Sequence, residues 1–251
     1  MRKIEKPGEA KRLEREFDAV LRSRLPGKSK TKYIEVLSQQ KISSIQIAIS
    51  VLKNPETPPP LQELLCWVLA RLNVKKAAKP ILRLLEEEKT DISMTAATAL
   101  SYLEIKSILP GLTRIARKSP QRMRREAACY ALSFMRDKRA AKTLLAIFRN
   151  RKETAAVRSQ AAEGLGNYRY RAAFRPLVAG LTDRNAAIRF WSIFALGQIG
   201  DNRAIPYLQQ IAKTDTAKVP GWWSIKKEAK DMIKSIQMLQ TDGDPAEVME
   251  C

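Results

Sequence analysis

The sequence contains no histidine, and this absence bears on function more than any other feature of its composition. Histidine is the usual general acid or base near neutral pH, a frequent metal ligand and a member of many nucleophile triads. A chain of 251 residues without it cannot perform any chemistry that requires an imidazole.

Cysteine is scarce, and its three positions do not form a metal or redox motif. Cys66 and Cys129 fall within apolar helical patterns, and Cys251 is the last residue. This placement predicts small buried side chains in a reducing compartment. The chain also lacks a glycine-rich phosphate loop and a Gly-x-Ser-x-Gly elbow. We therefore expect no catalytic residues, no metal and no cofactor, so that the protein is not an enzyme.

Long apolar runs are absent, so no membrane insertion is expected. The N-terminal stretch MRKIEKPGEAKRLEREF is charged and has no apolar segment of the kind that a secretory signal needs. These features predict a cytoplasmic protein.

Positive charge is abundant, with 46 Lys and Arg against 26 Asp and Glu and a formal net charge of +20. Such an excess goes far beyond what solubility requires and predicts attraction to anionic partners. It is concentrated in residues 114–189, which hold 19 basic and 5 acidic residues, and 15 of the basic residues are arginine. The arginine fork binds carboxylate and phosphate through paired hydrogen bonds.

A repeat of just over thirty residues organises the chain. Its anchor is a leucine that follows Ala or Gly in four of the five units and Val68 in the first, and the intervals between successive anchors are 31, 32, 33 and 31 residues. An apolar or aromatic residue follows each anchor by three positions, and another apolar residue follows by twelve. The anchors are Leu69, Leu100, Leu132, Leu165 and Leu196. One such unit cannot bury its apolar stripe alone, so the units are expected to stack.

The pattern predicts an all-α fold, an α-solenoid of about six helical hairpins. Residues 1–40 are expected to form a basic N-terminal helical cap, and residues 41–240 the solenoid. The acidic segment 241–251 is expected to be disordered. The hairpins are predicted at 42–73, 77–104, 107–136, 139–168, 172–199 and 203–240, each with its turn near the middle.

Three glycines have predicted roles in this scheme. Gly200 follows the end of a predicted helix, where a left-handed conformation suits glycine. Gly166 and Gly197 lie inside predicted helices, and we expect a neighbouring helix to approach closely there.

The segment DRNAAIRFWSIFALGQIGDNRAIPYL carries a family resemblance. It resembles HEAT repeats, and most closely the HEAT-like subtype first noted in phycobilisome lyases. A weaker match is AAVRSQAAEGLGNY, and the resemblance covers roughly residues 40–215. It implies the fold but says almost nothing about function.

Three enzyme groups of similar fold were compared with the sequence. Deoxyhypusine hydroxylases hold iron with His-Glu pairs, which a chain without histidine cannot supply. Alkylpurine DNA glycosylases use an Asp beside aromatic residues, but Trp222 and Trp223 are followed by Lys226 and Lys227. For bilin lyases, no chromophore-specific residue is present. A chromophore handler or a glycosylase-like enzyme remains a minor alternative.

The resemblance also implies roles for particular positions. Arg125, Arg158 and Arg189 occupy a position that in HEAT proteins often pairs with turn acids of neighbouring repeats. Asp183 stands six residues before Arg189 and fits this role, whereas Ser119 and Lys152 at the equivalent places do not. Arg125 and Arg158 thus have two interpretations, a structural ladder or a free ligand-binding group.

Two surfaces are candidates for binding. The first comprises basic rims at the hairpin turns, for which the candidate residues, including the three arginines above, are Arg122, Arg124, Arg125, Arg149, Arg151, Lys152, Arg158, Arg184 and Arg189. The second is the concave face, which the second helix of each HEAT hairpin usually lines. Its candidates stand two residues before the anchors, at Trp67, Thr98, Tyr130, Glu163 and Phe194. For Trp222 and Trp223, burial in the C-terminal cap is favoured over exposure.

The leading functional hypothesis is a non-enzymatic scaffold or adaptor that binds an acidic partner protein through its concave face and basic rims. The alternative is a nucleic-acid-binding protein that contacts the phosphate backbone with the arginines of 114–189.

Overall fold

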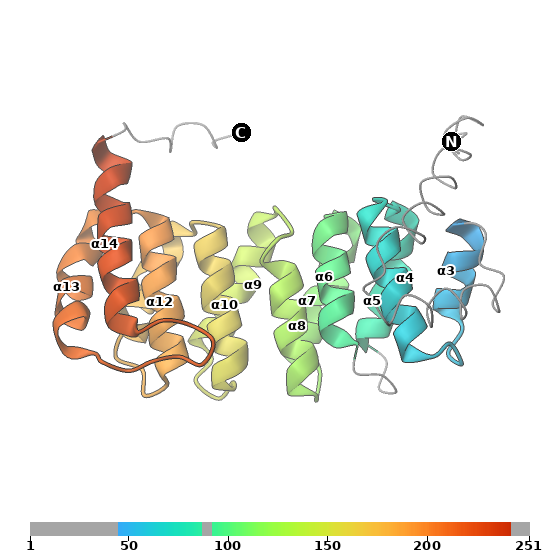
Figure 1. The fold of residues 1–251 in the computed structure, drawn as a ribbon, viewed down its shortest axis with the longest axis horizontal. Coiled ribbons are helices and arrows are strands. Elements are labelled where there is room, and N and C mark those ends of the chain that lie inside the picture. Colours follow the sequence, from blue (N-terminus) through green and yellow to red (C-terminus); the bar gives the residue numbers. More distant parts are fainter. Residues whose placement is uncertain (1–44, 87–91, 242–251) are drawn as a thin grey trace. The chain divides into compact units, whose positions relative to one another are not determined.

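The structure is a computed structural model that describes residues 45–86 and 92–241. The described residues form twelve α-helices and four short 3-10 helices, arranged as successive hairpins (Figure 1). The all-α solenoid fold class is therefore confirmed. The predicted cap at 1–40 and all but the first residue of the predicted tail at 241–251 lie outside the described residues.

The chain divides into two compact units, with the boundary after Gly111. The first unit contains α3 (Ile45–Lys53), α4 (Pro59–Arg71), α5 (Ala78–Glu86) and α6 (Ser93–Leu103). Short 3-10 turns precede the first helices of the hairpins, at Lys75–Ala77 and Lys106–Ile108. Within this unit α4 packs on α6, which makes the second helices of successive hairpins neighbours.

The boundary falls within α7 (Leu109–Lys118), and the second unit continues to the C-terminal end. Its helices are α8 (Arg122–Leu132), α9 (Lys138–Arg149), α10 (Ala155–Asn167), α11 (Phe174–Gly180), α12 (Ala186–Ile199), α13 (Ile205–Thr214) and α14 (Ile225–Thr241). The largest departure from the predicted ranges is in the hairpin 107–136, where the second helix, α8, ends at Leu132.

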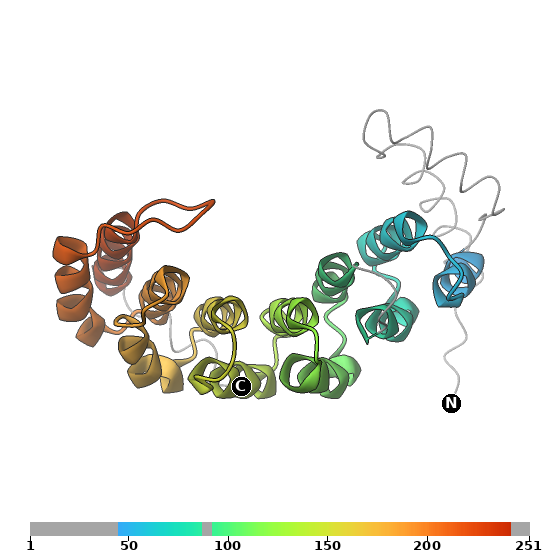
Figure 2. The ribbon, with the colours of Figure 1, turned by 90° about the horizontal axis from the view of Figure 1, so that it is seen from below.

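The second unit has two layers. Helices α8, α10, α12 and α14 pack side by side in one layer, while α9, α11 and α13 form the other (Figure 2). Figure 2 shows that the row bends within this unit so that α10, α12 and α14 lie on its inner side. We call the layer of α8, α10, α12 and α14 the inner layer and the other the outer layer.

The core follows the repeat that the sequence displays. All five anchor leucines are completely buried, and so are the residues twelve positions after them. Burying a leucine side chain contributes about 1.5–3 kcal/mol, so this periodic set is the main source of cohesion between hairpins. The residues after the anchors are Ile81, Leu112, Leu144, Leu177 and Leu208.

The corner after each second helix is also repeated. A residue four positions after each anchor has a positive φ, with φ 75° at Gly200, as predicted for that glycine. The other four corners place a side chain in the same left-handed region, at Asn73, Glu104, Arg136 and Arg169. Only one corner of five therefore uses the residue that tolerates this conformation without steric cost.

The helical glycines mark close helix contacts, as expected. A Cβ atom at Gly166 would lie 2.9 Å from the Ala195 Cα atom of α12 and 2.9 Å from the Phe194 ring. A Cβ atom at Gly197 would collide with Met232 of α14. These glycines let α10, α12 and α14 pack at short range within the inner layer.

Replacing Gly166 by Ala should destabilise the protein although alanine is the better helix former. The gain of about 1 kcal/mol in helix propensity is opposed by a clash with main-chain atoms, which cannot move aside. We expect a net loss of about 1–3 kcal/mol in the free energy of unfolding, measured by urea denaturation followed by circular dichroism. The exposed neighbour Asn167 supplies the control, since Asn167→Ala should change stability by less than about 0.5 kcal/mol. Equal stability of both variants would contradict the close packing of α10 on α12.

Candidate functional site

Three arginines of the inner layer form a ladder along the second unit. The first, Arg125 of α8, donates from Nε and Nη2 to the two carboxylate oxygens of Glu153, at 2.8 and 2.9 Å. Its Nη1 donates to the main-chain carbonyls of Ser119 and Pro120, at 2.8 and 3.1 Å. The guanidinium group thus joins the turn before its own helix to the turn of the next hairpin.

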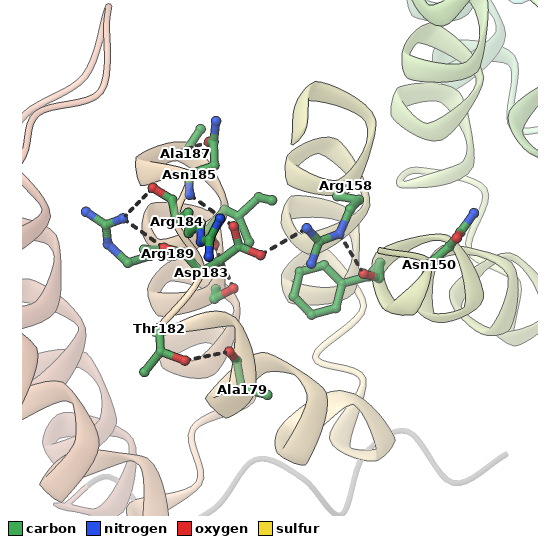
Figure 3. A network of polar contacts seen from close by, with 12 residues as sticks. Asn150, Arg158, Ala179, Thr182, Asp183, Arg184, Asn185, Ala187 and Arg189 are labelled. Atoms are coloured by element: carbon green, nitrogen blue, oxygen red, sulfur yellow. Dashed lines mark hydrogen bonds and ion pairs between the residues drawn. The ribbon is translucent and has the colours of Figure 1, made fainter. Parts of the chain in front are cut away.

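The next two rungs repeat this arrangement, and Figure 3 shows the contact of Arg158 with Asp183 and the position of Arg189 beside it. Arg158 of α10 donates to the Phe148 carbonyl at 3.0 Å and to Asp183 Oδ2 at 2.9 Å. Arg189 of α12 donates to the Asp183 carbonyl at 2.9 Å and to the two Asp215 carboxylate oxygens at 2.6 and 3.3 Å. The side chains of all three pairs are between 10% and 17% exposed, so water screens them weakly.

The ladder decides between the two interpretations of Arg125 and Arg158 in favour of the structural role, and it corrects the partner expected for Arg189. Arg125 and Arg158 are not free for a ligand, because the acid comes from the following turn and not from six residues before. Arg189 pairs with Asp215, while Asp183 offers it only a carbonyl oxygen. The signal in the sequence is an acid 25 to 28 residues after each arginine.

Each ladder acid also caps its own turn. Backbone N–H groups of Thr154, Asn185 and Ala217 donate to the acid one or two residues before them. Partial burial alone would raise the pKa of each carboxyl. The backbone donors and the arginine partners outweigh it and hold the pKa values of Glu153, Asp183 and Asp215 below their usual range.

The remaining rim candidates divide into two groups. Arg122, Arg149, Arg151, Lys152 and Arg184 are exposed, and we call these five residues the basic rim. Arg124 is only 3% exposed, so its assignment to the rim is wrong. It points toward the core from the helix face on which Ala128 and Ala131 are also buried.

All five concave-face candidates lie on second helices and are partly exposed between fully buried neighbours. Trp67 and Thr98 belong to the first unit, and Tyr130, Glu163 and Phe194 to the inner layer of the second. Burial raises the pKa of Glu163, an effect that a hydrogen bond from Gln160 opposes in part. Glu163 is thus a partly desolvated acid between helices that carry aromatic rings.

An aromatic cluster extends this surface beyond the predicted positions. Trp191 contacts Phe194, with ring centroids 5.4 Å apart, and Trp222 at 5.1 Å. Phe134 lies 5.1 Å from Tyr130 on the adjoining part of the layer. We call Tyr130, Phe134, Trp191, Phe194 and Trp222 the inner-face aromatics.

The loop between α13 and α14 holds the two tryptophans that the sequence analysis expected to be buried. Trp222 and Trp223 are 46% and 44% exposed, so that expectation is wrong. Figure 2 shows the loop projecting on the inner side of the second unit. Trp223 is fixed by its Nε1 atom, which donates to Glu228 at 2.6 Å, and by Lys227, whose ammonium group lies 4.8 Å from the ring centroid. Asp215 of the ladder stands where this loop begins.

The cysteines of the described chain are packing residues. Cys66 and Cys129 are completely buried and unpaired. Burial raises the pKa of both thiols, that of Cys66 to about 12, so neither is a thiolate near neutral pH. Among residues 45–86 and 92–241, no three potential ligands of the His, Cys, Asp or Glu type cluster around a metal position. No helix in the same ranges is long and apolar enough to span a membrane.

Stacked hairpins joined by this ladder define an α-solenoid repeat protein. The sequence profile of HEAT repeats matches residues 45–133 and 141–225, which is more than half of the chain, and the protein belongs to the HEAT-repeat family. No curated protein sequence matches the chain.

Several solved structures are similar to this one. A designed armadillo repeat protein in complex with the peptide (KR)4 is 14% identical, with a TM-score of 0.51 over 91% of this chain and 99% of that one. The complex of CpcE and CpcF of phycocyanin lyase from Nostoc sp. PCC7120 is 18% identical, with a TM-score of 0.40 over 76% and 94% of the two chains. Human deoxyhypusine hydroxylase is 15% identical, with a TM-score of 0.38 over 93% and 100%. At these identities the likeness shows the fold alone.

A double-mutant cycle should show that the ladder is structural. Arg158→Met and Asp183→Asn should each lower the free energy of unfolding by about 2–4 kcal/mol, because each leaves a poorly solvated partner unpaired. The coupling energy between them should be about 1–3 kcal/mol. The exposed pair Arg122–Glu126 is the control, with an expected coupling of about 0.5 kcal/mol or less. Similar coupling for both pairs would refute a special role for the ladder.

Acid should weaken the fold through the ladder carboxyls. Because their pKa values are lowered by folding, their contribution is complete above the usual carboxyl pKa of about 4 and is lost as the pH falls through the lowered values. The triple variant Glu153→Gln, Asp183→Asn, Asp215→Asn should be less stable than the parent protein at pH 7. It should also lose less stability than the parent when the pH is lowered. Urea midpoints measured from neutral to acidic pH test this, and parallel curves for variant and parent would contradict it.

Proposed function

We propose that this HEAT-repeat protein is a binding scaffold rather than an enzyme, and that it holds a segment of an acidic partner protein along the inner layer of its second unit. The observation that carries the proposal is the set of inner-face aromatics, which come from α8 and the turn after it, from α12 and from the loop before α14, and which remain partly exposed. Aromatic side chains of this kind dominate the binding energy of protein interfaces.

The aromatic side chains are held in place before any partner arrives. The Trp191 ring meets both Phe194 and Trp222 in edge-to-face geometry, with interplanar angles of 83° and 78°. A preordered surface loses little conformational entropy when it binds, which favours affinity. Their apolar faces would receive apolar side chains of the partner segment.

The basic residues at the turns indicate that the partner segment is acidic as well as apolar. Arg122, Lys152 and Arg184 are exposed at the turns that lead into α8, α10 and α12, and these turns lie along one edge of the unit. Acidic residues that flank an apolar segment would meet this edge. Such rim charges steer association and set specificity more than they add affinity.

The net positive charge also suggests nucleic-acid binding. The arrangement of the arginines supports this alternative less than it supports binding of an acidic protein. Three of the arginines in 114–189 are engaged in the ladder, and Arg124 is buried. The accessible arginines are therefore fewer than composition indicates, and the inner layer presents aromatic rings beside Glu163.

The test compares two variants in the same affinity-capture experiment on nuclease-treated native extract. Tyr130→Ala combined with Trp222→Ala removes two inner-face aromatics and should abolish capture of the partners that the parent retains. For a purified partner, each change should weaken binding by about 2 kcal/mol, or about thirtyfold.

Tyr207→Ala is the matched control, since Tyr207 is 49% exposed on α13 of the outer layer. It should leave the captured set unchanged. Equal capture by the inner-layer variant and the parent would contradict the proposal. Material that is captured only without nuclease treatment would favour the nucleic-acid alternative.

A further inference from the structure

The outer layer of the second unit contains a cavity of about 710 Å³ between α9 and α11. Its apolar floor includes Phe148, Phe174 and Ala179, and Gly180 lies at its base. Helix α11 has only 7 residues against the 12 of α9, so it covers less of its neighbour. A Cβ atom at Gly180 would lie 2.9 Å from the Phe148 ring, so glycine lets α11 approach the ring closely.

Arginine is the only basic residue type in the lining. The lining holds six arginines and one acid, Asp183, and the arginines are Arg149, Arg151, Arg158, Arg171, Arg175 and Arg203. They come from both edges of the hairpins, because α9 ends at Arg149 while α11 begins just after Arg171. The short α11 lets one cavity reach both edges.

Several of these arginines interact with other groups of the protein, Arg171 with the Asp201 carboxyl among them. Arg158 is paired with Asp183 in the ladder, as Figure 3 shows, and Arg203 is paired with Asp201. Within the described part of the chain, Arg149 and Arg175 have no ion pair or hydrogen bond, and both are exposed. The cavity therefore keeps a cationic excess that the described chain does not neutralise, and such an excess attracts an anionic ligand.

The aromatic floor is itself covered by guanidinium groups. Arg158 Cζ lies 5.6 Å from the Phe148 ring centroid, and Arg203 Cζ lies 4.8 Å from that of Phe174. Both guanidinium groups also donate hydrogen bonds within the protein, Arg158 to the Phe148 carbonyl and to Asp183, and Arg203 to Asp201. The rings are thus already occupied and are poorly placed to stack on a nucleobase.

We propose that this cavity binds a compact small molecule that carries several phosphate groups. Arginine forks match phosphate oxygens, and the volume lies within the range of about 300–1,000 Å³ that is usual for small-molecule sites. A single phosphate would leave most of the cavity and most of the arginines without contact. The site lies on the outer layer and does not include the inner-face aromatics, although Arg149 and Arg151 of the basic rim belong to its lining.

Isothermal titration calorimetry on the full chain, with tripolyphosphate and inositol hexakisphosphate as probes, tests the proposal. At physiological ionic strength we expect saturable binding of one molecule per chain, at least tenfold tighter than that of orthophosphate for the better probe. Arg149→Ala with Arg175→Ala should weaken it by about a hundredfold, because two groups that donate charged hydrogen bonds are removed.

Two further variants separate a specific site from general attraction. Lys152→Ala with Arg184→Ala removes the same charge from exposed positions outside the cavity lining and should change affinity by about twofold at most. Ala179→Glu keeps every arginine but places an acid in the cavity, and it should abolish binding. Equal losses in the two double variants would overturn the proposal.

Competition identifies the source of the phosphates. A single-stranded oligonucleotide and vesicles that contain phosphoinositide should bind more weakly than the free polyphosphate. If either binds more tightly and with the same dependence on Arg149 and Arg175, the site serves nucleic acid or a membrane and the proposal fails. Trp222→Ala should leave polyphosphate binding intact, which keeps this test separate from that of the inner layer.

Discussion

The second unit depends on the contact between an arginine on one inner helix and an acid in the following turn, which is bidentate at Arg125 and Arg189. Each guanidinium also binds carbonyl oxygens of its own hairpin, so one side chain satisfies the ends of two hairpins. Apolar burial holds neighbouring helices together but is not directional. The ladder adds direction, since its planar forks fix how one turn sits against the next. Its last rung, Arg189–Asp215, also anchors the start of the loop that carries Trp222.

The ladder divides the positive charge of the protein into two classes. Arginines that bridge hairpins are partly buried and hydrogen-bonded to acceptors in two hairpins, so they contribute to stability and little to binding. Arginines at the outer cavity and on the rim retain donors for other molecules. As a result, the inner layer exposes mainly aromatic rings and Glu163. The outer layer exposes the arginines that we propose bind phosphate groups. One solenoid unit thus presents two chemically different surfaces, each formed by one layer of helices.

Much of this architecture could be predicted because it is local or periodic. The burial of anchors such as Leu165 follows from their regular spacing. The close approach of a neighbouring helix at Gly166 follows from the absence of a side chain there. The ladder partners were missed because the acid was sought before its arginine, whereas Glu153 and Asp183 follow theirs by almost a full repeat. Arg124 was misplaced because a turn position does not reveal which way a side chain points. The cavity was not predictable from spacing, since it arises where the short α11 packs beside α9 and brings Arg149 and Arg175 to one space.

The measurement that tests the account most directly is the ¹⁵N NMR spectrum of the arginine Nε–H groups, recorded with and without tripolyphosphate. All three ladder arginines donate through Nε in the structure. The account predicts that the signals of Arg125, Arg158 and Arg189 exchange slowly with water and shift little when the anion is added. The signals of Arg149 and Arg175 should exchange fast in its absence and shift strongly in its presence. Rapid exchange of the ladder signals, or shifts confined to them, would contradict the division of the arginines between structure and binding.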